Sequence, residues 1–277
     1  MKRYFVQHGE MDVHITEWGD KNSPTIFCLH GLGSTSFSFI EIAESLQDMY
    51  RFISIDAPGH GKTAPFQDPR SYEMPKLAFW IDQLVNILKI DRFYFLSHSW
   101  GSFVTMFYLL EYHERVIGTI LIDGGYQTKR QMDQSLEEEI EYYEKDFEGY
   151  VFDTWSEYLE AEKEAYTRWS PLIEVAVKDL AFEKDNKIIW HVRGSTAKSI
   201  IQAMHKHETE DIYENLPSNI ILLSAGLPYK NGSYYEETTE FFKERTNSVV
   251  KIIDNTTHML HWDSPQTVIE GIKNNWG

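Results

Sequence analysis

Ser99 lies in a stretch whose residue types would suit a nucleophile. The residues FLSHSWGS, positions 95–102, place this serine directly after an apolar run. A serine hydroxyl attacks a carbonyl carbon only when a base accepts its proton and an acid orients that base. Small flanking residues, Ser97 (where a glycine is usual) and Gly101, would allow a sharp strand-to-helix turn that exposes the hydroxyl. We therefore predict Ser99 as the nucleophile, with a serine that only bonds its own turn as the alternative.

The base must come from another part of the chain. The chain has 11 histidines, so position along the sequence has to decide between them. His258 follows the last apolar run, residues 248–255, on a loop that can return to the strand ends, where ligands of open α/β sheets bind. We predict His258 as the base, with His261 as its rival. Three other histidines are interpreted differently: His30 and His60 as structural turn residues, and His98 as pointing away from the serine.

A glycine-rich turn could supply the oxyanion hole. HGLGS, residues 30–34, follows the first long apolar run. Glycines let the backbone bend there and expose N–H groups toward a developing negative charge. We predict that the N–H groups of Leu32 and Trp100 form the pair, Trp100 being the residue after the nucleophile. An ordinary turn is the alternative.

Alternating strands and helices must position these residues. Continuous apolar runs predict strands buried on both faces, and helical spacing of apolar residues between them predicts crossover helices of a parallel sheet. The final helix has Ser264 as its expected N-cap and Pro265 at its first position. The expected strands cover 25–31, the start of 51–61, 91–98, 116–123, 219–226 and 248–255, with two short strands in 3–19; the expected helices include 75–89, 102–113 and 264–276.

The strand rhythm breaks between about residues 126 and 216. This segment is acidic, aromatic and helix-prone, and it contains no run typical of a buried strand. We predict an inserted helical cap over residues 126–216, with residues 1–125 and 217–277 forming one α/β core. The aromatic side chains of the cap would suit the lining of a ligand pocket.

Composition limits the partners. The formal net charge is −17, from 43 acidic and 26 basic residues, so nucleic acid and anionic membranes should be repelled. We expect a small-molecule substrate and a monomer or homodimer. The lone Cys28 cannot form an internal disulfide, and we see neither a signal peptide nor a membrane span, so we expect a cytoplasmic protein.

Cofactor motifs are weak. The GHGK stretch could end a phosphate-binding loop, but that motif needs a glycine at its first position, and Ser54 stands there. HKH, residues 205–207, is the best metal candidate, and we interpret it as a helix surface. We therefore expect neither a metal nor a cofactor.

Taken in order, HGLGS, DAPGHGKT, SHSWGS and THMLHWDSP resemble the motifs of the α/β-hydrolase superfamily, over roughly residues 25–123 and 219–275. The resemblance implies an eight-stranded, mostly parallel sheet, a nucleophile elbow at Ser99 and a base at His258. A serine nucleophile points to the carboxylesterase-like serine hydrolases and away from the dehalogenase and epoxide-hydrolase branches, which use aspartate.

The acid of the triad departs from the usual pattern of this superfamily. After the strand NIILLSAG, where the family usually carries it, no carboxylate has the expected spacing, and Tyr229 stands near that place. Some members carry the acid after the preceding strand, which here ends at Asp123. A buried charge is costly unless it is paired, and His258 is the obvious partner. We predict Asp123 as the acid; the alternatives are Glu236, Glu237, Asp254 and Asp211.

Three functions fit these residues. The leading one is a serine hydrolase that cleaves carboxylic esters, or lactones and thioesters, of apolar or aromatic small molecules through an acyl-enzyme. A cofactor-independent ring-cleaving dioxygenase of the same fold also matches the SHS and TH residues. A ligand-binding signalling module that retains the triad is the third.

Overall fold

The computed structural model describes residues 1–132, 134–227 and 232–277. Within these residues eight strands form one sheet in the order β1-β2-β4-β3-β5-β6-β10-β11. Strand β2 runs antiparallel to its neighbours, and the remaining pairs are parallel. The strands are β1 (Lys2–His8), β2 (Met11–Trp18), β3 (Thr25–Leu29), β4 (Arg51–Ile55), β5 (Phe93–His98), β6 (Val116–Ile122), β10 (Ile220–Ala225) and β11 (Val249–Ile253).

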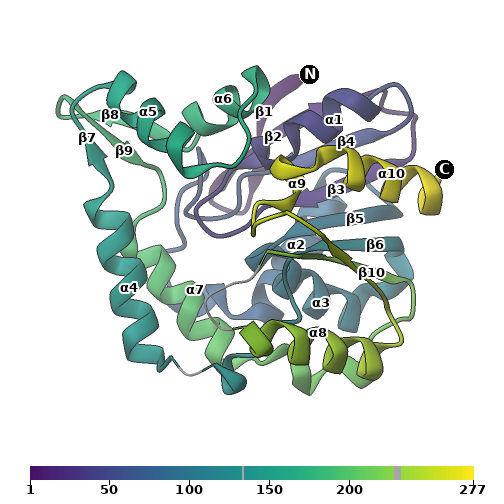
Figure 1. Cartoon of the computed structure of the whole chain (residues 1–277). Coiled ribbons are helices and arrows are strands. Elements are labelled where there is room, and N and C mark those ends of the chain that lie inside the picture. The colour runs from purple at the N-terminus through teal and green to yellow at the C-terminus, as the bar shows by residue number, and fades with distance from the viewer. Residues whose placement is uncertain (133, 228–231) are drawn as a thin grey trace.

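Helices cover both faces of this sheet (Figure 1). One face carries α2 (Met74–Ile87), α3 (Trp100–Tyr112) and α8 (Gly232–Thr246), and the other carries α1 (Ile40–Leu46) and α10 (Pro265–Trp276). Alternate strand residues enter the two cores, as the two-residue period of a strand requires. Phe27 and Phe95 pack on the side of α2 and α3, whereas Cys28 and Leu96 pack on the side of α1 and α10. The predicted α/β fold and parallel sheet are confirmed.

The segment between β6 and β10 folds beside the carboxyl ends of the strands (Figure 1). Its helices are α4 (Leu136–Gly149), α5 (Trp155–Ala165), α6 (Pro171–Lys178) and α7 (Gly194–Lys206). Among the described residues it also holds a three-stranded sheet of β7 (Val151–Phe152), β9 (Lys187–Trp190) and β8 (Ala181–Lys184), in that order. The sequence predicted helices here but not this small sheet. The proposed division into 1–125 with 217–277 and 126–216 stays a prediction.

The last helix begins as predicted, at Pro265 after Ser264. The Ser264 hydroxyl bonds the Thr267 hydroxyl at 2.8 Å rather than a backbone N–H, so the expected side-chain cap does not form. None of the helices in the described part of the chain is both long and apolar enough to cross a membrane.

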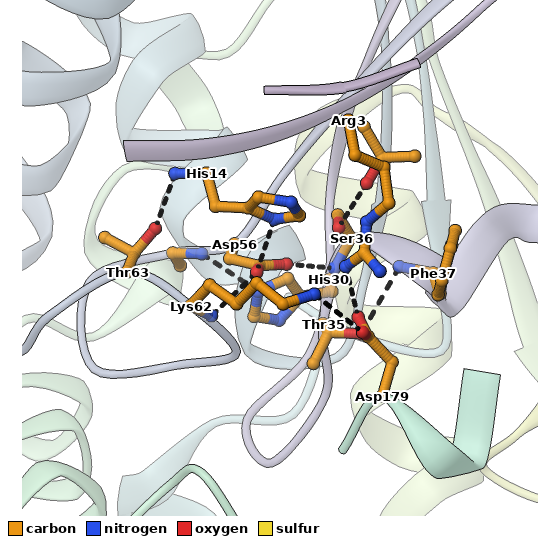
Figure 2. Close-up of polar contacts among 12 residues, drawn as sticks. Arg3, His14, His30, Thr35, Ser36, Phe37, Asp56, Lys62, Thr63 and Asp179 are labelled. Atoms are coloured by element: carbon orange, nitrogen blue, oxygen red, sulfur yellow. Dashed lines mark hydrogen bonds and ion pairs between the residues drawn. The ribbon is translucent and has the colours of Figure 1, made fainter. Parts of the chain in front are cut away.

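A buried carboxylate joins segments that border the carboxyl ends of the strands (Figure 2). Asp56, which directly follows β4, accepts hydrogen bonds from the backbone N–H groups of Ser36 at 2.7 Å and Lys62 at 2.9 Å. His14 of β2 lies 2.7 Å from the same carboxylate through Nδ1. Burial alone would raise the pKa of Asp56, but these hydrogen bonds outweigh it and hold the pKa well below its ordinary value. Asp56 therefore fixes the loop that follows β3.

A second acid at this place links the inserted segment to the sheet (Figure 2). Asp179, at the end of α6, accepts from Arg3 Nη2 at 2.7 Å and from Lys62 Nζ at 3.2 Å. Both bases belong to the α/β part of the chain. The end of α6 is thus held to the α/β part of the chain by charge as well as by packing.

We predict that Asp56→Asn lowers the free energy of unfolding by about 3 kcal/mol at neutral pH, because an amide cannot accept all the hydrogen bonds that the buried carboxylate accepts and so leaves buried donors unpaired. Urea unfolding followed by circular dichroism measures this. The exposed Asp48 provides the control, and Asp48→Asn should leave the unfolding midpoint nearly unchanged. Equal midpoints for the two variants would contradict the role given to Asp56.

The same carboxylate predicts a pH dependence. The pKa of Asp56 is lower in the folded than in the unfolded chain, so its contribution to stability is present above the ordinary value of 3.8 and is lost as the pH falls from there. Wild-type stability should therefore decline more steeply than that of Asp56→Asn as the pH drops below about 4. Unfolding curves at several pH values compare the two slopes, and parallel slopes would refute the expectation.

Candidate active site

Ser99 stands at a sharp turn between β5 and α3. Its backbone has φ 51° and ψ −125°, a conformation that residues other than glycine rarely adopt. The Ser99 N–H donates to the Ile122 carbonyl at 3.0 Å, which fixes the turn against β6. Gly101 is required by close approach, since a Cβ there would lie 2.5 Å from the carbonyl oxygens of Leu29 and His30. Ser97 is buried, and its hydroxyl lies 3.2 Å from that of Ser102, so a serine fits where the motif usually has glycine.

Ser99, His258 and Asp123 form a continuous hydrogen-bonded chain. His258 Nε2 lies 2.8 Å from Ser99 Oγ, and His258 Nδ1 lies 2.7 Å from Asp123 Oδ2. A carboxylate oxygen can only accept, so the ring proton sits on Nδ1 and Nε2 is free to accept from the serine hydroxyl. The structure thus brings together the three residues that the sequence selected. Their chemical roles remain a proposal.

The Asp123 carboxylate is fully buried and has further donors around it. Its Oδ1 accepts from the Ala225 N–H and from the Tyr126 hydroxyl, each at 2.9 Å. Burial and the charge of Asp123 both raise the pKa of Tyr126, so this phenol stays protonated and keeps donating. Gly124 allows the close approach of this loop to the elbow, because a Cβ there would lie 2.3 Å from the Ser99 carbonyl oxygen. The sequence did not predict Tyr126 or Ala225 as partners.

The other acids weighed for the triad lie elsewhere. Glu236 and Glu237 are exposed on α8, and Asp254 is exposed after β11. Asp211 binds the Arg130 guanidinium on the surface, with oxygen-to-nitrogen distances of 2.6 and 2.7 Å. Tyr229, near the place where the superfamily usually has its acid, lies outside the described residues. Of these acids, the structure brings Asp123 to the histidine.

His98 and His261 flank His258 without contacting Ser99 through a hydrogen bond in the described structure. His98 Nε2–H donates to the His258 backbone carbonyl at 2.8 Å, so it holds the loop that carries the predicted base. His261 Nε2 lies 2.9 Å from the Ser38 hydroxyl. Burial lowers the pKa of His98 well below its ordinary value and, with the neighbouring His258, lowers that of His261 to about 3. His261, the alternative base, is therefore buried and bonded to Ser38. The contact by which His98 positions the His258 loop was not predicted.

The turn after β3 presents Leu32 beside the serine. His30 Nε2 accepts from the Ala57 N–H at 3.0 Å, so its Nδ1 carries the proton and donates to the Gly31 carbonyl at 2.7 Å. The predicted structural role of His30 fits these contacts. Among the described residues, neither the Leu32 N–H nor the Trp100 N–H donates a hydrogen bond to another group. The two remain available, and their role as an oxyanion hole stays a prediction.

Ser99 and His258 open onto two cavities. The first, which we call the aromatic pocket, has a volume of about 250 Å³ and includes Leu32, Tyr166 and Trp190 in its lining. The second, the polar pocket, measures about 440 Å³. Its lining includes Lys129 and Glu139, which form a buried ion pair with each other. A substrate bound across the serine could therefore place one part in each pocket.

The HKH stretch is engaged in ion pairs. His205 Nε2 lies 2.7 Å from Glu139, and His207 Nε2 lies 3.4 Å from Glu73. In the described part of the chain no group of three or more histidine, cysteine or acidic residues could hold a metal ion.

Comparison with known proteins agrees with this architecture. Residues 24–157 match the family model described as the alpha/beta hydrolase fold. A serine hydrolase-like protein from Danio rerio is 31% identical over 106 residues, which are 38% of this chain and 32% of that protein. A serine hydrolase-like protein from Homo sapiens is 29% identical over 38% of this chain and 52% of its own length. These matches span only about a third to a half of the relatives.

Solved structures match over nearly the whole chain. The thioesterase domain from the curacin biosynthetic pathway superposes with a TM-score of 0.80 at 15% identity, covering 99% of both chains. E-2-(acetamidomethylene)succinate hydrolase superposes with a TM-score of 0.81 at 17% identity, covering 99% of this chain and 98% of its own. Such identities show the fold alone. The family model over residues 24–157 and the solved structures together show that this chain has the α/β-hydrolase fold.

Proposed function

We propose that this chain is a serine hydrolase that cleaves carboxylic esters, lactones or thioesters of apolar or aromatic small molecules. The observation that carries the proposal is the chain from Ser99 Oγ through the His258 ring to the buried Asp123, with distances of 2.8 and 2.7 Å. The first distance allows proton transfer from the serine to the imidazole, and the second allows the carboxylate to orient the ring. The serine hydrolase-like relatives support the class of reaction.

Acylation begins when His258 Nε2 accepts the Ser99 hydroxyl proton as the oxygen attacks the acyl carbon. The tetrahedral intermediate carries its negative charge on the former carbonyl oxygen, where the N–H groups of Leu32 and Trp100 would stabilise it. His258 then gives the proton to the leaving alcohol or thiol, which departs and leaves an ester on Ser99. Asp123 keeps the ring in the required tautomer and stabilises the imidazolium that forms.

Deacylation repeats these steps with water. His258 Nε2 removes a proton from a water molecule, whose oxygen attacks the acyl carbon. Collapse of the second intermediate breaks the bond to the serine oxygen, which recovers its proton from His258. The carboxylic acid leaves and the free enzyme is restored.

The aromatic pocket supports the proposed substrate class. Tyr143, Phe147 and Trp190 contribute rings to it, and aromatic linings favour apolar and aromatic groups. The cavities on either side of the serine leave room for both an acyl group and a leaving group. A thioesterase domain among the structural neighbours is consistent with acyl transfer to water on this fold.

Hydrolysis of p-nitrophenyl esters from acetate to octanoate tests the nucleophile. We expect kcat/KM of wild type to exceed that of Ser99→Ala by at least about 10³-fold, because removal of a triad member removes covalent catalysis. Ser156→Ala, at an exposed position on α5, should match wild type. If Ser99→Ala keeps full activity, the mechanism is wrong. Oxygen uptake with heteroaromatic substrates that needs His258 but not Ser99 would instead indicate the dioxygenase.

Substitution of the acid tests Asp123. Asp123→Asn keeps the side-chain shape but lets His258 adopt the wrong tautomer, so kcat should fall by about 10³- to 10⁴-fold. Glu236→Gln, on the exposed face of α8, should leave kcat unchanged. Thermal unfolding of both variants shows whether the fold is retained. A silent Asp123→Asn beside an inactive Glu236→Gln would reverse the assignment.

A further inference from the structure

The aromatic pocket is walled by rings from both parts of the chain. Phe147 of α4 and Trp190 of β9 have centroids 5.4 Å apart. Tyr166, at the end of α5, meets Trp262 of α9 (Leu260–Asp263) edge to face, with centroids 4.9 Å apart. A Cβ built on Gly33 would lie 3.2 Å from the Phe147 ring, so this ring covers the turn next to Leu32. The rings therefore surround the space where one end of a substrate would lie.

The charge in this pocket is negative and uncompensated. Asp146 of α4 contributes to the lining from an exposed position, and among the described residues it has neither a hydrogen bond nor an ion pair. Partial burial raises the pKa of its carboxyl group, the effect expected of an acid that lacks a neighbouring cation. The described lining contains no lysine or arginine. A cationic group that entered the pocket would supply the missing partner.

A second acid lies behind the rings. Glu162 of α5 is 2% exposed, although it carries a carboxyl group. Burial raises the pKa of its carboxyl group, an effect that the neighbouring side chains of Tyr150, Tyr166 and Trp190 partly offset. Two of these three side chains also line the aromatic pocket. Glu162 thus lies next to two of the walls of the pocket.

The polar pocket differs in charge. Its Lys129 is paired with Glu139, and Glu139 also contacts His205. The negative charge of Glu139 is therefore balanced by a neighbouring cation, whereas that of Asp146 is not. A cation is therefore attracted to the aromatic pocket in preference to its neighbour.

We propose that the aromatic pocket binds an alkylammonium group, and that the favoured substrates are esters or thioesters that carry one. Aromatic faces attract quaternary ammonium ions through the ring quadrupole, and a nearby carboxylate adds to the attraction. The net charge of −17 also favours the approach of cations. The inference deepens the proposed hydrolase function and rests on it in so far as the bound molecule is called a substrate. The binding of an alkylammonium group itself requires no turnover.

Isothermal titration calorimetry with two isosteric probes tests the binding. Choline and 3,3-dimethylbutan-1-ol have the same shape, but only choline is charged. The full-length wild-type chain should bind choline about tenfold more tightly than the neutral alcohol. Equal affinities, tighter binding of the alcohol, or no choline binding would overturn the proposal.

Variants locate the binding. Asp146→Asn should weaken choline about fivefold and leave the alcohol unchanged, because it removes only the charge. Glu141→Gln is the matched control: it removes one charge from the same helix at an exposed position outside the pocket lining. Trp190→Leu should weaken choline about tenfold through loss of the ring face. If Asp146→Asn and Glu141→Gln weaken choline equally, the effect is the general field of the protein and the pocket proposal fails.

A turnover assay separates this inference from the proposed function. The substrates are p-nitrophenyl 4-(trimethylammonio)butanoate and p-nitrophenyl 5,5-dimethylhexanoate, which differ in charge and not in shape. We expect kcat/KM to be about tenfold higher for the charged ester. If choline binds as expected but neither ester is hydrolysed, the hydrolase function fails and the cation site stands. If both esters are hydrolysed alike and choline does not bind, the cation site fails and the hydrolase stands.

Discussion

The buried charge of Asp123 is the constraint on which the rest of this structure depends. A carboxylate with no exposed surface is tolerated only when donors surround it, and here they come from a backbone N–H, a phenol and an imidazole. These donors belong to the start of the inserted segment, to β10 and to the loop after β11. The carboxylate therefore sets the mutual position of segments more than 100 residues apart in sequence. His258 reaches Ser99 because its other ring nitrogen is held in this way.

The turn at Ser99 and the turn after β3 meet a different constraint, which is space. The backbone of the turn after β3 comes so close to α3 that no side chain fits at Gly101, and the elbow comes so close to the loop after β6 that none fits at Gly124. Asp56 then restrains the same turn from its far side through the Ser36 N–H. Close approach and a buried charge together fix the backbone around the candidate site. A preorganised oxyanion hole, if Leu32 and Trp100 form one, requires such a fixed backbone.

Much of this could be predicted from the sequence because the relevant patterns are local. Continuous apolar runs such as TIFCL and IILLSA indicate strands buried on both faces, and the structure confirms them as β3 and β10. Asp123 could be selected because a charge at the end of such a run needs a partner. The strands β7, β8 and β9 were missed because they are two to four residues long and partly exposed, so no alternation develops. The contact from His98 to the His258 carbonyl could not be predicted, since it depends on the path of a distant loop.

The neighbouring imidazoles constrain how charge is distributed during a reaction. His98 lies between His258 and His261, with ring-centroid distances of 4.8 and 4.3 Å, and burial lowers the pKa of both His98 and His261. They are uncharged at neutral pH, so the row tolerates a single positive charge, and His258 is the member that faces Asp123. In the proposed mechanism, a proton taken from Ser99 would therefore stay on the His258 ring, because burial disfavours the charged form of His98 and of His261. The two buried, uncharged rings would thus keep the proton on His258, where the leaving group of the proposed reaction collects it.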